Sequence, residues 1–138
     1  MILQTDLAYL AGLIDGEGTI SCSVNKTKKG FLALQKQLSI FNTNIVLISW
    51  ITARFSGTVH SRVRSEKWKE EHQVKWSATE AVIILELVLP YLVIKREQAE
   101  IFIALHKTKS NSVSKETHEY RQRLCDRIQE LNKRGPKP

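Results

Sequence analysis

One helix near the N-terminus carries almost no side chains along one of its faces. Residues 7–20, LAYLAGLIDGEGTI, have apolar residues at the spacing i, i+3, i+4 and i+7, which predicts a helix with one face in the core. A second face of this helix carries the small residues Ala8, Gly12 and Gly16. Each interior glycine costs roughly 1 kcal/mol of helix stability relative to alanine. Because close approach of another backbone is the usual reason for such a face, we expect a second segment to pack against it.

The composition predicts one soluble domain over residues 1–138, with a disordered tail at about residues 134–138. No apolar run reaches the roughly 18 residues that a membrane span needs, and the N-terminus has no signal-peptide pattern. Cys22 and Cys125 have no metal-ligand spacing, as is typical of thiols in a reducing compartment. We therefore expect an intracellular protein, of the bacterial cytoplasm or of an organelle such as a mitochondrion or chloroplast, without membrane contact.

The chain is strongly basic. It has 21 Lys and Arg residues against 14 Asp and Glu residues, a formal net charge of +7. This balance suits a polyanionic partner such as a nucleic acid. Charge alone does not establish that partner, since many basic domains are merely soluble.

Hydrophobic periodicity predicts an α+β fold in which two strands follow the first helix, two more follow a second helix, and further helices end the chain. The strands are expected at residues 19–26, 32–41, 58–65 and 72–78. The later helices are expected at residues 42–57, 80–89, 95–107 and 116–133.

Alternation along the four strands gathers polar side chains on one face of the expected sheet. They are Thr19, Ser21, Ser23, Asn25, Gln35, Gln37, Ser39, His60, Arg62, Arg64, Gln73, Lys75 and Ser77. None of these residues is acidic, although a solvated surface normally mixes both signs of charge. Arginine pairs with guanine, and glutamine or asparagine with adenine, in the major groove of DNA. We expect this face to bind double-stranded DNA; the alternative is an ordinary solvated face.

The segment LAGLIDGEG, residues 10–18, resembles the signature of the LAGLIDADG homing endonucleases. It matches that signature at seven of nine positions, with Gly16 in place of alanine and Glu17 in place of the second aspartate. The order of elements also resembles the αββαββα core of this family, with additional C-terminal helices, so the resemblance extends from Thr5 to about Lys133. It implies an antiparallel sheet that forms a DNA-binding saddle.

The resemblance also implies a dimer. In this family two such helices pack backbone against backbone, which here places Ala8, Gly12, Asp15 and Gly16 at the interface. Asp15 is expected to bond the N-terminal end of the partner helix. Because the sequence has one copy of the motif and no internal repeat, the second helix must come from a second chain, in a homodimer with an isologous interface.

By the same resemblance, Glu17 and the backbone carbonyl of Gly16 are metal ligands. Hard cations such as Mg²⁺ prefer oxygen ligands and keep several waters. The expected cofactor is therefore Mg²⁺, with Mn²⁺ able to substitute and Ca²⁺ expected to support binding without cleavage. Glutamate at position 17 is compatible with catalysis but departs from the commoner aspartate.

Two further positions match family slots. Asn42 matches a polar residue that holds metal-bound water; the alternative is a helix-capping asparagine. Lys95 matches a cation that polarises water or stabilises the phosphorane, and the alternative is a surface lysine. If the alignment is shifted by one residue, Arg96 takes this place.

We therefore predict a homodimeric, Mg²⁺-dependent endonuclease that cuts both strands of a long, partly palindromic DNA site and leaves short 3′ overhangs. On the polar face named above, we expect base contacts from Gln35, Gln37, Arg62, Arg64 and Lys75. We expect phosphate contacts from Lys26, Lys28 and Lys29. The alternative is a non-catalytic protein on the same scaffold, either a maturase that binds intron RNA or a DNA-binding regulator.

Overall fold

The computed structural model describes residues 1–26, 32–63, 65–66, 69–108 and 114–133. The helices are α1 (Gln4–Glu17), α2 (Ile45–Phe55), α3 (Ala78–Val88), α4 (Arg96–Lys107) and α5 (Lys115–Asn132), with a 3-10 turn, η1 (Leu89–Tyr91). The strands are β1 (Gly18–Lys26), β2 (Leu32–Asn42), β3 (Thr58–Arg62) and β4 (Glu71–Ser77). The predicted α+β order is confirmed. None of the described helices is long and apolar enough to span a membrane.

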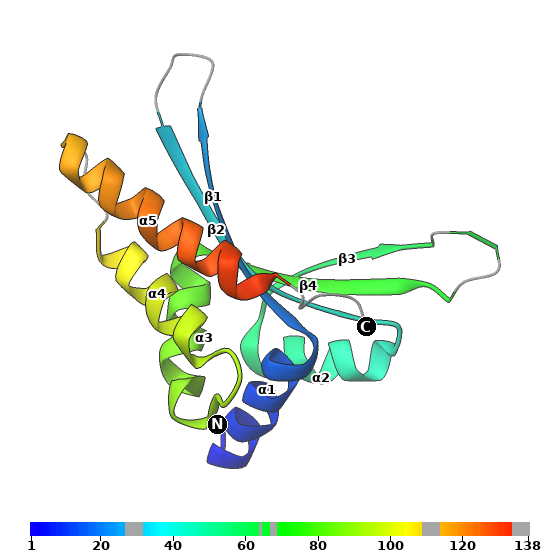
Figure 1. Ribbon diagram of the computed structural model, residues 1–138. Coiled ribbons are helices and arrows are strands. Elements are labelled where there is room, and N and C mark those ends of the chain that lie inside the picture. The colour runs from blue at the N-terminus through cyan, green and yellow to red at the C-terminus, as the bar shows by residue number, and fades with distance from the viewer. Residues whose placement is uncertain (27–31, 64, 67–68, 109–113, 134–138) are drawn as a thin grey trace, which may run out of the picture.

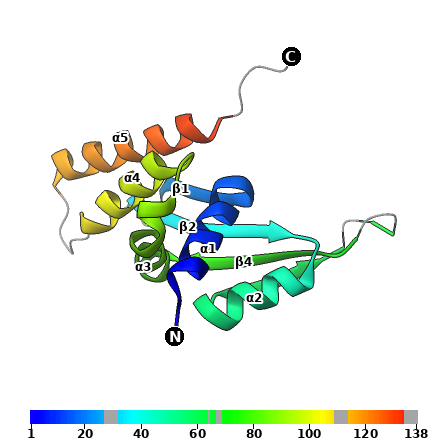
Figure 2. The same ribbon diagram turned by 90° about the horizontal axis from the view of Figure 1, so that it is seen from below.

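The four strands form one antiparallel sheet in the order β1-β2-β4-β3. The helices gather on one side of this sheet, and the β1–β2 and β3–β4 hairpins reach beyond them in different directions (Figure 1). Seen from below, α1 lies between α2 on one side and α3 and α4 on the other (Figure 2). An antiparallel sheet with helices on one face leaves its other face for solvent or a partner.

The core lies between the sheet and the helices. Alternate strand residues project to opposite faces, and Ile20, Leu38, Ile40, Val74 and Trp76 on the inner face are fully buried. The helices contribute the apolar stripe predicted for α1, in which Leu10, Ala11 and Ile14 are also fully buried. The two periodicities, 2 for the strands and 3.6 for the helix, therefore meet in one core.

A tight passage from α2 into β3 fixes how the second hairpin leaves the core. Gly57 has a φ of +107°, and a Cβ at this position would lie 2.6 Å from Val74, so glycine is required by both backbone conformation and space. Nε1 of the buried Trp76 donates a 3.0 Å hydrogen bond to the carbonyl of Phe55, the last residue of α2. This bond ties the end of α2 to β4.

The edge of the sheet at β1 is covered by α5. Side-chain amides of Gln129 and Asn132 donate hydrogen bonds to the backbone carbonyls of Cys22 and Ile20, at 3.0 and 2.7 Å. Unpaired carbonyls along an edge strand invite pairing with other chains. The two amides satisfy these carbonyls and attach α5 to the strand that follows α1.

The second hairpin differs from the prediction at its ends. β3 stops at Arg62, and all five of its residues are exposed. Val59 is 41% exposed although it lies opposite the fully buried Val74, because β3 is an edge strand of the sheet. β4 begins at Glu71, one residue earlier than predicted. Glu71 lies opposite Arg62, so the polar face of the sheet includes an acidic residue that the sequence prediction left out.

Candidate active site

The motif helix passes directly into the sheet. α1 ends at Glu17 and β1 begins at Gly18, with no connecting loop between them. A Cβ on Gly18 would lie 2.8 Å from the Cα and the carbonyl oxygen of Ile14, so the chain can leave the helix this tightly only at a glycine. The passage leaves Glu17 exposed at the point where helix and sheet meet.

Glu17 and Asn42, which the sequence predicts to act together, are in contact. Nδ2 of Asn42 donates a 2.8 Å hydrogen bond to Oε2 of Glu17. Oδ1 of Asn42 accepts a 2.7 Å hydrogen bond from the N–H of Asn44. Asn44 is itself the cap of α2, accepting from the N–H of Val46 at 2.9 Å. Asn42 therefore links the carboxylate to the start of α2, and the capping alternative for α2 belongs to Asn44.

Asp15 binds a distant segment of its own chain, a contact that the resemblance did not imply. Its carboxylate accepts hydrogen bonds from three successive N–H groups of its own chain, those of Val93, Ile94 and Lys95, at 2.9, 3.1 and 2.9 Å. The expected bond from Asp15 to the partner helix stays a prediction. The segment that precedes α4 runs alongside the end of α1, and an anion is the natural acceptor for converging amides.

Lys95 binds back to the end of α1, so that Asp15 and Lys95 together form a clamp between α1 and the segment before α4. Its Nζ donates to the carbonyls of Ile14, Asp15 and Gly18, at 3.0, 3.3 and 2.5 Å. Burial lowers the pKa of Lys95, and the negative charge of Asp15 opposes that shift. Lys95 is therefore not a free surface lysine: its ammonium group binds the last carbonyls of α1, where the helix dipole places negative charge.

The site offers one carboxylate to a metal ion. Among the described residues there is no group of three or more His, Cys, Asp or Glu side chains that could hold one. Glu17 is exposed, and the carbonyl of Gly16 is not among the acceptors that Lys95 occupies. Mg²⁺ is commonly bound through one or two carboxylates, waters and substrate phosphates. The donors present fit such an ion, provided that further oxygens come from outside the chain.

Within the described part of the chain, nothing covers the small-residue face of α1. Ala8, Gly12 and Gly16 are exposed, and a Cβ on either glycine would meet no described atom within 4 Å apart from its sequence neighbours and the adjoining backbone of α1. The close backbone approach that the sequence predicts is therefore not made within the described part of this chain. The segment that we expect to pack against these glycines is therefore not among the described residues of this chain.

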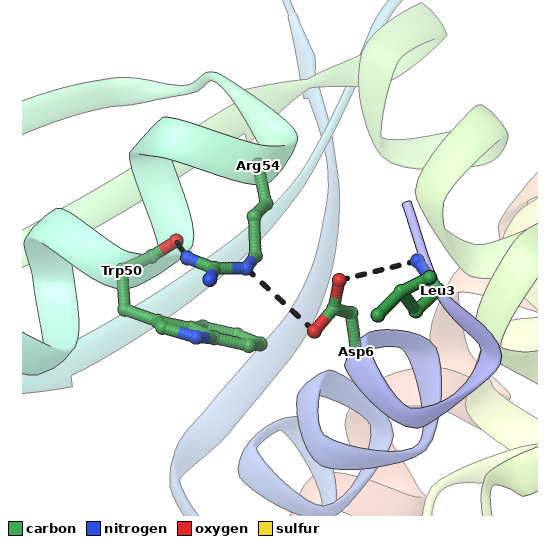
Figure 3. A network of polar contacts seen from close by, with 4 residues as sticks. All are labelled: Leu3, Asp6, Trp50 and Arg54. Carbon is green, nitrogen blue, oxygen red and sulfur yellow. Dashed lines mark hydrogen bonds and ion pairs between the residues drawn. The ribbon is translucent and has the colours of Figure 1, made fainter. Parts of the chain in front are cut away.

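A hollow of about 440 Å³ lies beside this face, between α1 and α2. It is lined by Thr5, Asp6, Tyr9, Asn44, Val46, Leu47 and Trp50. Arg54 supports one wall of the hollow. Its Cζ lies 4.4 Å from the ring centroid of Trp50, and its Nε lies 3.6 Å from Oδ1 of Asp6 (Figure 3). Asp6 also accepts a 3.1 Å hydrogen bond from the N–H of Leu3 (Figure 3). These contacts hold the first turn of α1 against α2.

The strand register places the predicted DNA contacts on one sheet face, which we call the outer face. The described members that project from it are Ser21, Ser23, Asn25, Gln35, Gln37, Ser39, His60, Arg62, Gln73 and Lys75. Ser39 is 2% exposed, because it lies in a central strand between Thr19 and Lys75. In this structure its side chain is therefore not at the surface, contrary to its predicted role. Lys28, Lys29 and Arg64 are outside the described residues, as is the predicted tail at residues 134–138, and Lys26 is described for its backbone alone.

Glu71 and Phe41 also lie on the outer face, and the sequence analysis did not assign them to it. Glu71 lies opposite Arg62, with 3.3 Å between Oε2 and Nε. Phe41 projects from the same face of β2 and is 41% exposed. The signal for Glu71 was available, since extending the alternation of β4 by one residue toward the N-terminus puts Glu71 in phase with Gln73.

The comparisons with known proteins agree with this geometry. The sequence profile described as LAGLIDADG endonuclease matches residues 10–94. A crystal structure of the homing endonuclease I-CvuI in complex with the I-CreI target has a TM-score of 0.80 at 23% identity, covering 98% of this chain and 87% of that chain. The archaeal intron-encoded homing endonuclease I-Vdi141I, complexed with DNA, has a TM-score of 0.80 at 15% identity, over 96% and 87%.

A third structure, the LAGLIDADG meganuclease I-AabMI bound to uncleaved DNA, has a TM-score of 0.66 at 25% identity, over 86% of this chain and 43% of that chain. Curated protein sequences give no significant match. The likeness to I-CvuI and I-Vdi141I, which this chain covers at nearly full length, establishes a shared fold.

Proposed function

Because this chain belongs to the LAGLIDADG endonuclease family, we propose that it is a site-specific DNA endonuclease that works as a metal-dependent homodimer. Its sheet would lie on the DNA, and Glu17 would hold the metal at the scissile phosphate. The observation that carries this proposal is the pairing of Glu17 with Asn42 at the point where α1 enters the sheet.

The open face of α1 supports the dimer. Two flat helix faces can pack at backbone distance, and the described residues of one chain leave this face uncovered. If the two helices run in the same direction about a two-fold axis between them, both copies of Glu17 reach the same end of the pair. One chain provides one carboxylate, and the second chain then provides the other.

Apolar groups on either side of this face fit the same arrangement. Successive helix residues are rotated by about 100°, so Tyr9, one residue after Ala8, and Asp15, one residue before Gly16, lie on opposite sides of the small-residue face. The Asp15 side carries Val93 and Ile94, which are 82% and 71% exposed although their backbone is held by Asp15. The Tyr9 side carries the hollow. In a two-fold pair of parallel helices, one side of each helix meets the opposite side of its partner, so Val93 and Ile94 would approach the partner's hollow.

The metal site would be built from few donors. The carboxylate of Glu17 and the carbonyl of Gly16 would hold the ion, together with phosphate oxygens of the DNA and waters. A bound divalent cation supplies two effects: it lowers the pKa of a coordinated water and stabilises charge on the leaving oxygen. Mg²⁺ is the proposed ion.

The surrounding residues orient the carboxylate. Asn42 binds Oε2 of Glu17 and is in turn fixed by Asn44. Lys95 binds carbonyls at the end of α1 and offsets their partial negative charge. Without Lys95, that charge would repel the carboxylate of Glu17 and the DNA phosphates. In this proposal Asn42 and Lys95 position the site rather than exchange protons.

The outer face would read the DNA. Amide, hydroxyl and cationic side chains share that face, and such groups bind base edges in the major groove. A long site would be covered by two copies of the sheet, one from each subunit, so that the site is partly palindromic. Cutting across the minor groove would leave short 3′ overhangs.

The test is to incubate the full chain with a library of randomised duplexes and to sequence the ends produced. We expect double-strand cuts at a limited set of partly palindromic sites with Mg²⁺, and binding without cutting with Ca²⁺. If the dimer binds DNA but cuts no sequence, the protein is a DNA-binding regulator. If it selectively binds intron RNA instead, it is a maturase. Either result overturns the endonuclease proposal.

A further inference from the structure

Glu71 places a negative charge on the outer face, where the other charged side chains that the structure describes, Arg62 and Lys75, are basic. It lies directly opposite Arg62 in the sheet, so both side chains project from the outer face. Nε of Arg62 donates a 3.3 Å hydrogen bond to Oε2 of Glu71, and the two side chains are 59% and 24% exposed. A carboxylate on a DNA-facing surface repels phosphates. Its position there therefore calls for a specific reason.

Arg62 is held from two directions. Glu71 binds it at Nε. Cζ of Arg62 also lies 6.0 Å from the ring centroid of Phe41, within the outer range of a cation–π contact. A bond at Nε fixes the plane of the guanidinium, which is rigid and presents its donors as a fork. The terminal nitrogens Nη1 and Nη2 lie in the same plane as Nε and are not used by this hydrogen bond, and such a pair can donate to O6 and N7 of guanine.

We propose that Glu71 is a positioning residue that orients Arg62 to recognise a guanine in each half of the DNA site. The proposal rests on the proposed function, in which the outer face reads DNA. An arginine that is ordered before binding loses less conformational entropy when it meets the base. Glu71 thus acts through Arg62. Its charge lowers the general affinity for phosphates, and its contact with Arg62 raises selectivity at one base pair.

The experiment measures binding of the full-length homodimer to a duplex library in the presence of Ca²⁺. Arg62→Ala first identifies the base pair, as the position in each half-site where a guanine preference of roughly 5- to 150-fold disappears. Glu71→Ala should then reduce the preference at that same position by about 2- to 10-fold. The same variant should bind unrelated DNA more tightly than wild type, because one repulsive charge is gone.

Two controls separate positioning from charge and from folding. Glu70→Ala removes the same charge from the exposed residue before β4 and should tighten general binding without changing the guanine preference. Glu71→Gln keeps an acceptor for Nε and should retain more of the preference than Glu71→Ala. In Arg62→Ala/Glu71→Ala, the guanine preference should equal that of Arg62→Ala alone, because the two residues act as one unit.

The outcomes also separate this inference from the proposed function. A wild-type protein that selects no DNA site would overturn the proposed function. A protein that selects a site, with a base preference unchanged by Glu71→Ala or lowered additively in the double variant, would overturn the positioning role alone. A uniform loss of affinity for all sequences would do the same, since it would show a structural role.

Discussion

Nδ2 of Asn42 donates a 2.8 Å hydrogen bond to Oε2 of Glu17 across 25 positions of sequence. Asn42→Ala removes the group that holds this carboxylate. Residues that orient a metal ligand typically contribute 10- to 100-fold to activity, so we expect DNA cleavage to fall by about that factor while DNA affinity stays within about twofold of wild type. Single-turnover cleavage and a gel shift on one target give the two quantities.

The control for this prediction is Asn44→Ala. Asn44 caps α2, and loss of a cap costs about 1 kcal/mol of stability without releasing Glu17. If both variants lose stability and neither loses cleavage, Asn42 serves the fold rather than the site.

Gly12→Leu should convert the dimer into folded monomers. Apart from its sequence neighbours and the adjoining backbone of α1, a Cβ at this position meets no described atom within 4 Å, so leucine fits the isolated subunit and removes a helix cost of about 1 kcal/mol. At the dimer interface the same side chain would hold the helices apart. Sedimentation equilibrium and circular dichroism measure the two effects, and Glu119→Leu on the exposed surface of α5 is the matched control. A Gly12→Leu protein as dimeric as wild type would exclude α1 from the interface.

Asp15→Ala should destabilise the subunit by about 2–3 kcal/mol, because three backbone N–H groups lose a charged acceptor. Urea unfolding in the Gly12→Leu background measures this without a contribution from dimerisation. Asp126→Ala is the control, since Asp126 accepts a hydrogen bond from the side chain of Gln122 on the exposed surface of α5. Equal losses in the two variants would mean that the clamp adds nothing to stability.

The buried thiols predict how stability depends on pH. Burial raises the pKa of Cys22 and that of Cys125. As pH rises above the ordinary thiol value of 9.0, the unfolded chain releases protons that the folded chain retains, so the free energy of unfolding falls. Comparing wild type with Cys22→Ala/Cys125→Ala at about pH 7.5 and about pH 10 isolates this effect. The wild type should lose more stability than the variant, and parallel losses would contradict the assignment.

The local patterns of the sequence predicted most of the fold. The apolar stripe of α1 and the alternation in β1 and β2 are determined by neighbours a few residues apart, and the structure confirms them. Family resemblance selected Glu17, Asn42 and Lys95, and the structure brings all three to the end of α1. Their catalytic roles stay predictions.

Other features could not be predicted because they depend on contacts between distant segments. Asp15 meets N–H groups 78 to 80 positions away, and no local pattern reveals that acceptor. Ser39 has the polar alternation of its strand, but its burial depends on both neighbouring strands. The predicted strand begins at residue 72, one residue after the true start of β4 at Glu71, so one strand boundary changes the charge predicted for the whole face.

The most direct test of the account is Glu17→Gln, which keeps the size of the side chain and removes its charge. Cleavage should be lost with Mg²⁺, because a neutral amide is a poor ligand for a hard cation. DNA affinity in the presence of a chelator should equal or exceed that of wild type, because carboxylates and phosphates repel each other when no cation lies between them. A nicking assay and a gel shift on one cleaved target measure both. Wild-type cleavage by the Glu17→Gln homodimer would show that the metal centre lies elsewhere.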